Sequence, residues 1–88
     1  MEFEWDEDKN QANVLKHGIN FREAITIFNG RVVEYTSTKR DYGEVRTLAI
    51  GELDGKIIVV IYTIRHGIYR IISSRRASRD ERRAYSEI

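Results

Sequence analysis

The sequence predicts an α+β protein: a short N-terminal strand, two helices, an antiparallel sheet of about four strands, and a short C-terminal helix. Two observations support this order. The spacing of apolar residues is helical up to about residue 30 and changes, from Arg31 onward, to the spacing of strands. Two dipeptides, Asp54-Gly55 and His66-Gly67, separate apolar runs in the second half, as in tight antiparallel hairpins.

The N-terminal part of the chain predicts a short edge strand over residues 3–5, followed by two helices. Asp6 has the character of a helix N-cap, and the first helix is expected to run to about His17 and stop at Gly18, where a left-handed residue is needed. Asn20 is expected to cap the second helix. The buried stripe predicted for this second helix consists of Phe21, Ala24, Ile25 and Phe28.

Four strands are expected in the second half, over residues 31–36, 45–52, 56–65 and 68–74. The third is nearly all apolar, which predicts a central strand that is covered on both faces. The polar segment 37–44 is expected to be a loop, which would bring Tyr42 and two basic residues to one end of the sheet. Ser78 and Glu81 have the spacing of a capping box and open the C-terminal helix.

An 88-residue chain has the length of one domain, so a single domain over residues 1–88 is expected. The chain contains no cysteine, which excludes disulfides and thiolate metal sites. Its two histidines lack metal-binding spacing, and there is no glycine-rich phosphate loop, so neither a metal ion nor a cofactor is predicted. The acidic N-terminus and the short apolar runs predict a cytoplasmic protein with no membrane association.

Positive charge is concentrated in the second half of the chain. Residues 1–44 carry six basic and nine acidic side chains, a sum of −3, whereas residues 45–88 carry nine and five, a sum of +4. Residues 70–85 alone hold six arginines, two acids and no lysine. Because the planar guanidinium group suits phosphate oxygens, this composition indicates an anionic ligand. The alternative is that the arginines of the C-terminal helix form a solvated face, partly neutralised by neighbouring acids.

The two hairpin turns determine which side chains share a face of the sheet. They predict that Thr63 lies between Arg46 and Arg70 in one row across three strands, with Arg65 on the same face nearer the turn. We interpret the arginine pair as a phosphate clamp, meaning two guanidinium groups that bind one phosphate.

The next row on that face is predicted to contain Leu48, Ile61 and Ile72. The alternative to the clamp is that its two arginines are solvated, or are paired with Glu23 or Asp41.

Metal-free RNA cleavage is one reaction that such arginines can serve. It needs a base for the 2′-hydroxyl proton, cations for the phosphorane and an acid for the leaving oxygen. Arginines supply the cations but not easily the base. The residue pattern leaves His17, Glu81, Tyr85 or a lysine as candidates for proton transfer.

Several short motifs follow one another in a specific order along nearly the whole chain. They are Phe3-Glu4-Trp5-Asp6, Lys9, Asn13, Lys16-His17-Gly18, Phe21-Arg22-Glu23-Ala24, Phe28, Arg46, Gly51 and the ending Arg70 to Ala77 with Glu81, Arg82 and Tyr85. Together they resemble the BrnT family of type II toxins. The resemblance implies a RelE-like fold and a metal-independent endoribonuclease, a hydrolase that arrests growth by cutting RNA.

The resemblance also implies partners, and together with the sheet register and the arginine run it gives the candidate site residues. The partners are the RNA substrate and a BrnA-like antitoxin with a ribbon-helix-helix part, and operator DNA is bound only through the complex of the two proteins. The catalytic candidates are Arg46 and Arg70 on the scissile phosphate, with His17 or Glu81 transferring protons. The RNA-binding candidates are Lys16, Arg65, Arg75, Arg79 and Tyr85. The alternative function is a non-catalytic binding module whose arginines hold an acidic partner or a nucleic acid.

Overall fold

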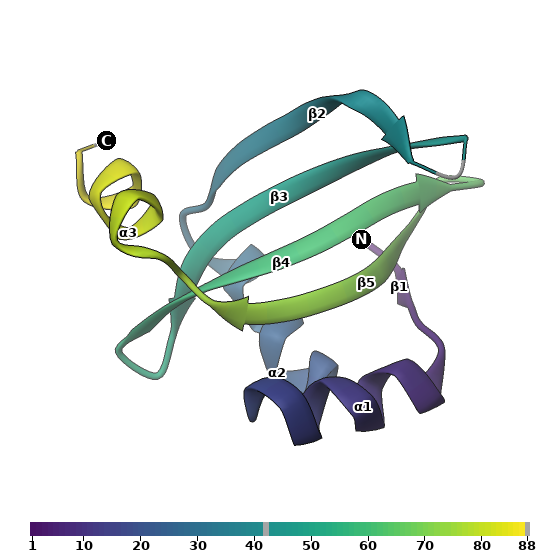
Figure 1. Cartoon of the computed structure of the whole chain (residues 1–88), viewed down its shortest axis with the longest axis horizontal. Coiled ribbons are helices and arrows are strands. Elements are labelled where there is room, and N and C mark those ends of the chain that lie inside the picture. Colours follow the sequence, from purple (N-terminus) through teal and green to yellow (C-terminus); the bar gives the residue numbers. More distant parts are fainter. Residues whose placement is uncertain (42, 88) are drawn as a thin grey trace.

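The computed structural model describes residues 1–41 and 43–87, apart from the side chains of residues 38–41. Over this part of the chain, five strands form one sheet in the order β1-β5-β4-β3-β2. The N-terminal helices lie on one side of the sheet, and α3 lies at one end of it (Figure 1). The elements are β1 (Phe3–Glu4), α1 (Glu7–His17), α2 (Phe21–Ala24), the 3-10 helix η1 (Ile25–Asn29), β2 (Val33–Asp41), β3 (Glu44–Leu53), β4 (Lys56–Arg65), β5 (Ile68–Arg76) and α3 (Arg79–Ser86). The predicted α+β class is confirmed.

Helix α1 begins and ends where the sequence predicts. The Asp6 carboxylate accepts a hydrogen bond of 2.9 Å from the backbone N–H of Asp8. Gly18 has a φ of 71°, and its N–H donates to the carbonyl of Val14 at 2.8 Å. A left-handed residue ends the helix here because it satisfies one of the last unpaired carbonyls.

The buried side chains of α1 are two asparagines, so polar contacts attach this helix to the rest of the fold. The Asn10 amide oxygen accepts from the backbone N–H of Phe21 at 2.8 Å. The Asn13 amide bonds both backbone groups of Ser74 on β5, at 2.9 and 3.1 Å, and also donates to the Ile19 carbonyl. Asn13 therefore satisfies the edge of β5 where no strand adjoins it.

The second helical segment is mostly a 3-10 helix, which changes its buried stripe. Helix α2 ends at Ala24 and η1 continues to Asn29. Phe21 and Ala24 are fully buried as predicted, but the next fully buried residue is Ile27, whereas Ile25 and Phe28 are only partly buried. A 3-10 helix has three residues per turn, so positions three apart lie on one line and the four-residue step of the prediction does not apply.

Both hairpins form as predicted. Their central residues have positive φ, at 50° and 79° for Asp54-Gly55 and 53° and 78° for His66-Gly67. These values fit the primed turns whose twist matches antiparallel strands. The register places Glu52 opposite Ile57.

The sheet is larger than predicted, because strand structure continues into the expected loop 37–44. Strand β2 extends to Asp41 and β3 begins at Glu44, with a register shift between Thr36 and Arg40. Tyr42, which was expected in this loop, lies outside the described residues. The segment forms a strand despite its polar composition because it pairs with β3. Strand β2 lies at the edge of the sheet, where polar and charged residues are common. Strand β1 adds a fifth, parallel strand beside β5, so the sheet is mixed.

A β-bulge at Ile72 corrects one predicted row. Ile61 pairs with Ser73 and Tyr62 pairs with Ile71, so Ile72 is the extra residue of β5. The predicted row of Leu48, Ile61 and Ile72 is therefore wrong, and Ser73 takes the last position. The extra residue also reverses the alternation of β5 beyond it, because successive side chains point to opposite faces.

The two faces of the sheet are covered differently. The larger core lies between the sheet and the N-terminal helices and contains Ile19, Phe21, Ala24, Ile27, Ala49, Ile58, Val60, Tyr62 and Ile71. On the other face, α3 covers a smaller core of Val33, Ile50, Val59 and Ala77. Strand β4 is central, as predicted, but Ile61 on this second face is only partly buried. Of the helices in the described residues, none is long and apolar enough to cross a membrane.

Candidate functional site

The part of the second face that α3 leaves uncovered, here called the open face, carries the predicted arginine row. Thr63 on β4 pairs with Arg70 on β5. On the other side of β4, Tyr62 pairs with Thr47, so the register places the preceding residue, Arg46, opposite Thr63. Thr63 is buried, and its hydroxyl donates to the Val45 carbonyl at 2.8 Å. The three residues occupy adjacent strands of a hydrogen-bonded sheet, so their relative positions are held by the backbone.

A carboxylate lies beside this row, although the predicted row contains no acid. Glu4 on β1 is the register partner of Arg70, and its Oε2 accepts from Arg70 Nη1 at 2.9 Å. The Glu4 side chain is 38% exposed and that of Arg70 is 28% exposed. Arg70 is thus paired with Glu4 rather than with Glu23, and Asp41, the other partner weighed from the sequence, lies outside the described side chains. No local signal in the sequence identifies Glu4, because its position depends on β1 joining β5 across more than sixty residues.

A second, mostly apolar row lies next to the arginines on the open face. Tyr35 pairs with Leu48, Leu48 with Ile61, and Ile61 with Ser73. Leu48 and Ile61 are partly buried and Tyr35 is 52% exposed. The sequence predicts the Leu48–Ile61 part of this row, whereas Tyr35 enters it only through the register of β2 on β3.

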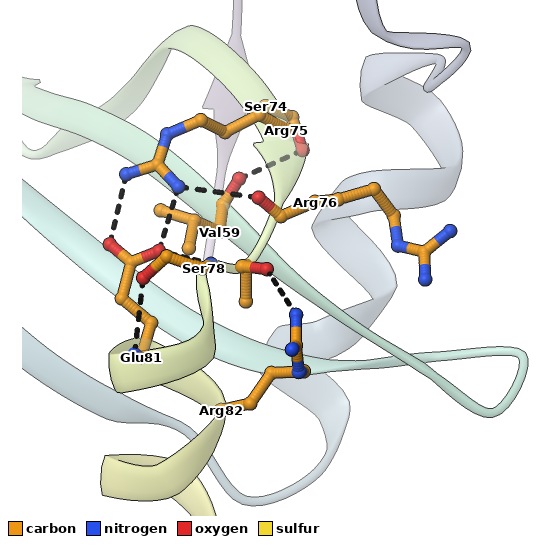
Figure 2. Close-up of polar contacts among 8 residues, drawn as sticks. Val59, Ser74, Arg75, Arg76, Ser78, Glu81 and Arg82 are labelled. Atoms are coloured by element: carbon orange, nitrogen blue, oxygen red, sulfur yellow. Dashed lines mark hydrogen bonds and ion pairs between the residues drawn. The ribbon is translucent and has the colours of Figure 1, made fainter.

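The bulge brings Arg75 to the same face as the arginine row, and α3 binds it there (Figure 2). The Glu81 carboxylate accepts from both terminal nitrogens of Arg75, at 2.7 and 2.9 Å. The same carboxylate accepts from the N–H of Ser78 at 2.8 Å, and the Ser78 hydroxyl accepts from the N–H of Glu81, so the predicted capping box is confirmed. The Arg75 hydrogen bonds, with the added contribution of Ser78, lower the pKa of Glu81 to about 2.

The neighbouring arginines of the C-terminal stretch serve different surfaces. Arg76 points away from Arg75 toward the side of α1 (Figure 2). Arg75 pairs with Val59 and Arg70 with Thr63, four residues apart on β4. At about 3.3 Å per residue, this separates Arg70 and Arg75 by roughly 13 Å along one face.

His17 and Lys16 are not brought to the arginine row. They end α1, which packs on the side of the sheet opposite the open face (Figure 1). His17 lines a cavity of about 210 Å³ together with Glu23, Lys56, Ile58 and Arg76. Ile58 is five residues from Thr63 on β4, so this cavity lies about 16 Å along the sheet from the arginine row, as well as on its other side.

The remaining predicted residues have contacts within the protein or are exposed. Arg65 forms an ion pair with Glu44. Arg79 is exposed in the first turn of α3. The Tyr85 hydroxyl donates to the Arg31 carbonyl at 3.2 Å, and the Arg31 guanidinium lies 4.0 Å from the centre of the Tyr85 ring. These contacts attach α3 to the segment that leads into β2 and explain Tyr85 without a nucleic acid.

An open sheet face that combines fixed arginines, a carboxylate and an apolar row has the features of a surface that binds a nucleic-acid strand. Residues 5–81 match the family described as the ribonuclease toxin BrnT of type II toxin-antitoxin systems. The match covers most of the chain, so the protein belongs to this family, as the sequence motifs indicated. It is a ribonuclease toxin, and its family implies an RNA target and an antitoxin partner. No curated protein matches the sequence.

Proposed function

We propose that this protein is a RelE-like endoribonuclease toxin that cleaves RNA without a metal ion, on the open face of the sheet. The observation that carries the proposal is the row of Arg46, Thr63 and Arg70 with the Glu4 carboxylate beside it. Two guanidinium groups, on the strands that flank β4, supply fixed positive charge at the point where a phosphodiester gains negative charge. In other nucleases a metal ion supplies that charge.

The reaction uses the 2′-hydroxyl of the RNA itself. A base removes the 2′-O–H proton, the 2′ oxygen bonds to the adjacent phosphorus, and the bond from phosphorus to the 5′ oxygen breaks. The products are a 2′,3′-cyclic phosphate and a 5′-hydroxyl. The guanidinium groups of Arg46 and Arg70 stabilise the negative charge on the phosphorane oxygens. The leaving 5′ oxygen takes its proton from water at this exposed face.

We assign the base to Glu4. Its carboxylate is next to Arg70 and 38% exposed, so a substrate held by Arg70 has direct access to it. Glu81 is the weaker candidate, because both of its carboxylate oxygens are bound by Arg75, roughly 13 Å along the face from Arg70, and these bonds lower its pKa to about 2. His17 is the more distant candidate, because it lies on the other side of the sheet. In this assignment Glu81 positions Arg75, which contacts the RNA strand beyond the scissile phosphate.

The proposed neutralising partner is a BrnA-like antitoxin with a ribbon-helix-helix part, and the complex rather than the toxin binds operator DNA. Membership in a type II toxin family supports the existence of the antitoxin. The toxin's net charge of +1 supports the proposal that the toxin alone does not bind operator DNA, because DNA binding by a single protein relies on many phosphate contacts from basic residues.

Cleavage of a defined RNA by the purified protein tests the proposed function. The substrate is incubated with EDTA present, and the product ends are analysed. We expect 2′,3′-cyclic phosphate and 5′-hydroxyl ends, and no cleavage of the same strand made of DNA. Arg46→Ala and Arg70→Ala should each lower kcat roughly 100- to 1,000-fold, the range for removal of one donor to a developing oxyanion. Glu4→Gln should also lower kcat, because the amide cannot take up the 2′-hydroxyl proton.

Arg83→Ala is the matched control, because it removes the same charge from an exposed position on α3. It should cleave like the parent. Cleavage that requires a divalent ion would overturn the metal-independent reaction, and full activity of a folded Arg70→Ala protein would overturn the clamp. A folded parent that binds RNA but leaves it intact, and does not arrest growth when produced alone, would favour the non-catalytic binding module.

A further inference from the structure

The apolar row of the open face takes no part in the proposed cleavage step, yet it lies directly beside the arginine row. Along each strand the two rows are two residues apart, about 7 Å at 3.3 Å per residue. Leu48 and Ile61 form the floor of the row, and Tyr35 stands at its edge on β2. Partly exposed apolar side chains on a rigid sheet, next to fixed positive charge, suit a ligand that joins a flat apolar ring to an anion.

A cavity of about 340 Å³ is present at this row. Arg46 lines it together with Tyr35, Leu48 and Ile61, and the hydroxyl-bearing residues Thr36 and Ser37 border it. Its volume is at the small end of the roughly 300–1,000 Å³ of ligand sites, which is appropriate for one ring system. Arg46, which belongs to the clamp, therefore also borders an apolar recess.

We propose that this recess is a nucleobase subsite, in which the base of a nucleotide flanking the scissile phosphate rests on Leu48 and Ile61 and stacks against the Tyr35 ring. The inference rests on the proposed function, because the clamp defines which phosphate is scissile. The distance between the base and the phosphate of a nucleotide is similar to the distance between the two rows of this sheet, about 7 Å. A phosphate bound at Arg46 therefore brings an adjacent base to the recess. Hydroxyl groups at the border give the subsite a means to distinguish one base edge from another.

Base stacking on an aromatic side chain is the interaction that decides the choice of occupant. Every base has a flat π-face, and each stacked base adds affinity in single-strand-binding proteins. A protein segment would have to bring an acidic group to Arg46 and a flat apolar group to the row, whereas every nucleotide already joins the two. The ligand favoured by the charge and the shape is therefore a nucleotide.

The test uses oligonucleotides with a single ribose in an otherwise 2′-deoxy strand, so that one bond alone can be cleaved. In separate substrates, the base on the 5′ side or on the 3′ side of that bond is replaced by an abasic residue. Tyr35→Ala should lower kcat/KM about 5- to 150-fold, the fold-change that corresponds to the loss of one stacked base. For the parent, kcat/KM should be lower by a similar factor with one of the two abasic substrates than with the intact substrate. For Tyr35→Ala, kcat/KM should be the same with that abasic substrate and with the intact one.

Two control variants accompany the test. Tyr35→Phe retains the ring and should stay within about twofold of the parent, because stacking does not require the hydroxyl group. Ile64→Ala removes an apolar side chain that is 56% exposed on the opposite face and should leave kcat/KM unchanged.

A binding measurement separates failure of the subsite from failure of the proposed function. An all-deoxy strand with 2-aminopurine beside the central phosphate should lose fluorescence on binding to the parent but not to Tyr35→Ala. If each abasic substitution changes kcat/KM by the same factor in the parent and in Tyr35→Ala, the subsite is overturned and the proposed function stands. Tyr35-dependent quenching without cleavage of any RNA would overturn the proposed function and support the subsite. Retained cleavage with lost antitoxin binding in Tyr35→Ala would assign the recess to the partner protein and overturn the inference.

Discussion

Glu81→Gln is the substitution that best tests how the open face is assembled. The Glu81 carboxylate holds Arg75 through two hydrogen bonds and closes the capping box of α3. Glutamine is nearly the same size and can still accept from Ser78 at this position, so the substitution removes the charge and retains the cap. The expected change in stability therefore reports the ion pair with Arg75.

The magnitude follows from the lowered pKa of Glu81. A decrease from 4.5 to about 2 corresponds to an upper bound of roughly 3.4 kcal/mol, at about 1.36 kcal/mol per pKa unit. Solvent screening reduces this bound, because the Arg75 side chain is 34% exposed. We expect Glu81→Gln to lower the free energy of unfolding by about 1–2 kcal/mol at pH 7, or roughly 4–8 °C in Tm per kcal/mol for a domain of this size.

The pH dependence gives the sharper measurement. The pKa of Glu81 is lower in the folded state than in the unfolded state, so its stabilisation is complete above about pH 4.5 and is lost as the pH falls toward 2. Urea unfolding of parent and variant, followed by the fluorescence of Trp5, should show a difference that is largest at pH 7 and shrinks below pH 4.5. Asp80→Asn, an exposed acid in the same turn, is the matched control. An equal difference at pH 3 and pH 7 would refute the ion-pair explanation.

Three further substitutions test the rest of the fold by urea unfolding. Gly51→Ala should destabilise the protein by about 1–3 kcal/mol, because the new Cβ would lie 2.7 Å from the Ile27 Cβ. Gly30→Ala is the control and should have little effect, because the nearest atom to its new Cβ is at 3.9 Å. Equal effects of the two substitutions would contradict the close packing of η1 on β3. Asn13→Leu should cost about 2–3 kcal/mol by leaving the backbone groups at the edge of β5 unpaired, and a stability equal to the parent would show that water replaces the amide. Deletion of Ile72 should leave cooperative unfolding intact, because Ile71 and Ser73 keep their partners on β4 when the extra residue is removed, and loss of the folded state would show that the bulge itself is required.

Local chemistry accounts for the parts of the fold that the sequence predicted well. Asp6, Gly18 and Ser78 act within one helical turn of their own position, and the two X-Gly turns act within four residues. Such interactions need no distant partner, so their positions can be read directly from the chain. The register of the two hairpins follows from the turns, which is why the pairing of Thr63 with Arg70 was predictable.

Long-range packing accounts for the parts that differed. The polar segment 37–44 became largely strand because β3 offers it a hydrogen-bonding partner. Ile27 replaced Ile25 and Phe28 as a fully buried residue because the 3-10 geometry of η1 changes the period. Both depend on contacts between elements that are separate in the sequence, which propensity and periodicity do not encode.

The sequence alone determined the membership of this protein in the BrnT family, the order of its elements and the arginine pair of its central hairpins. Short-range signals carry this information, since caps, turns and alternation are physical properties of neighbouring residues. Only the tertiary structure decided that Glu4 joins the arginine row, that Tyr35 borders it, and that the bulge at Ile72 turns Arg75 onto the same face. The positions of these three side chains depend on the order of the strands and on one extra residue in β5. Both are fixed by backbone pairing between segments that are distant in the sequence, and this pairing exists only once the whole sheet has formed.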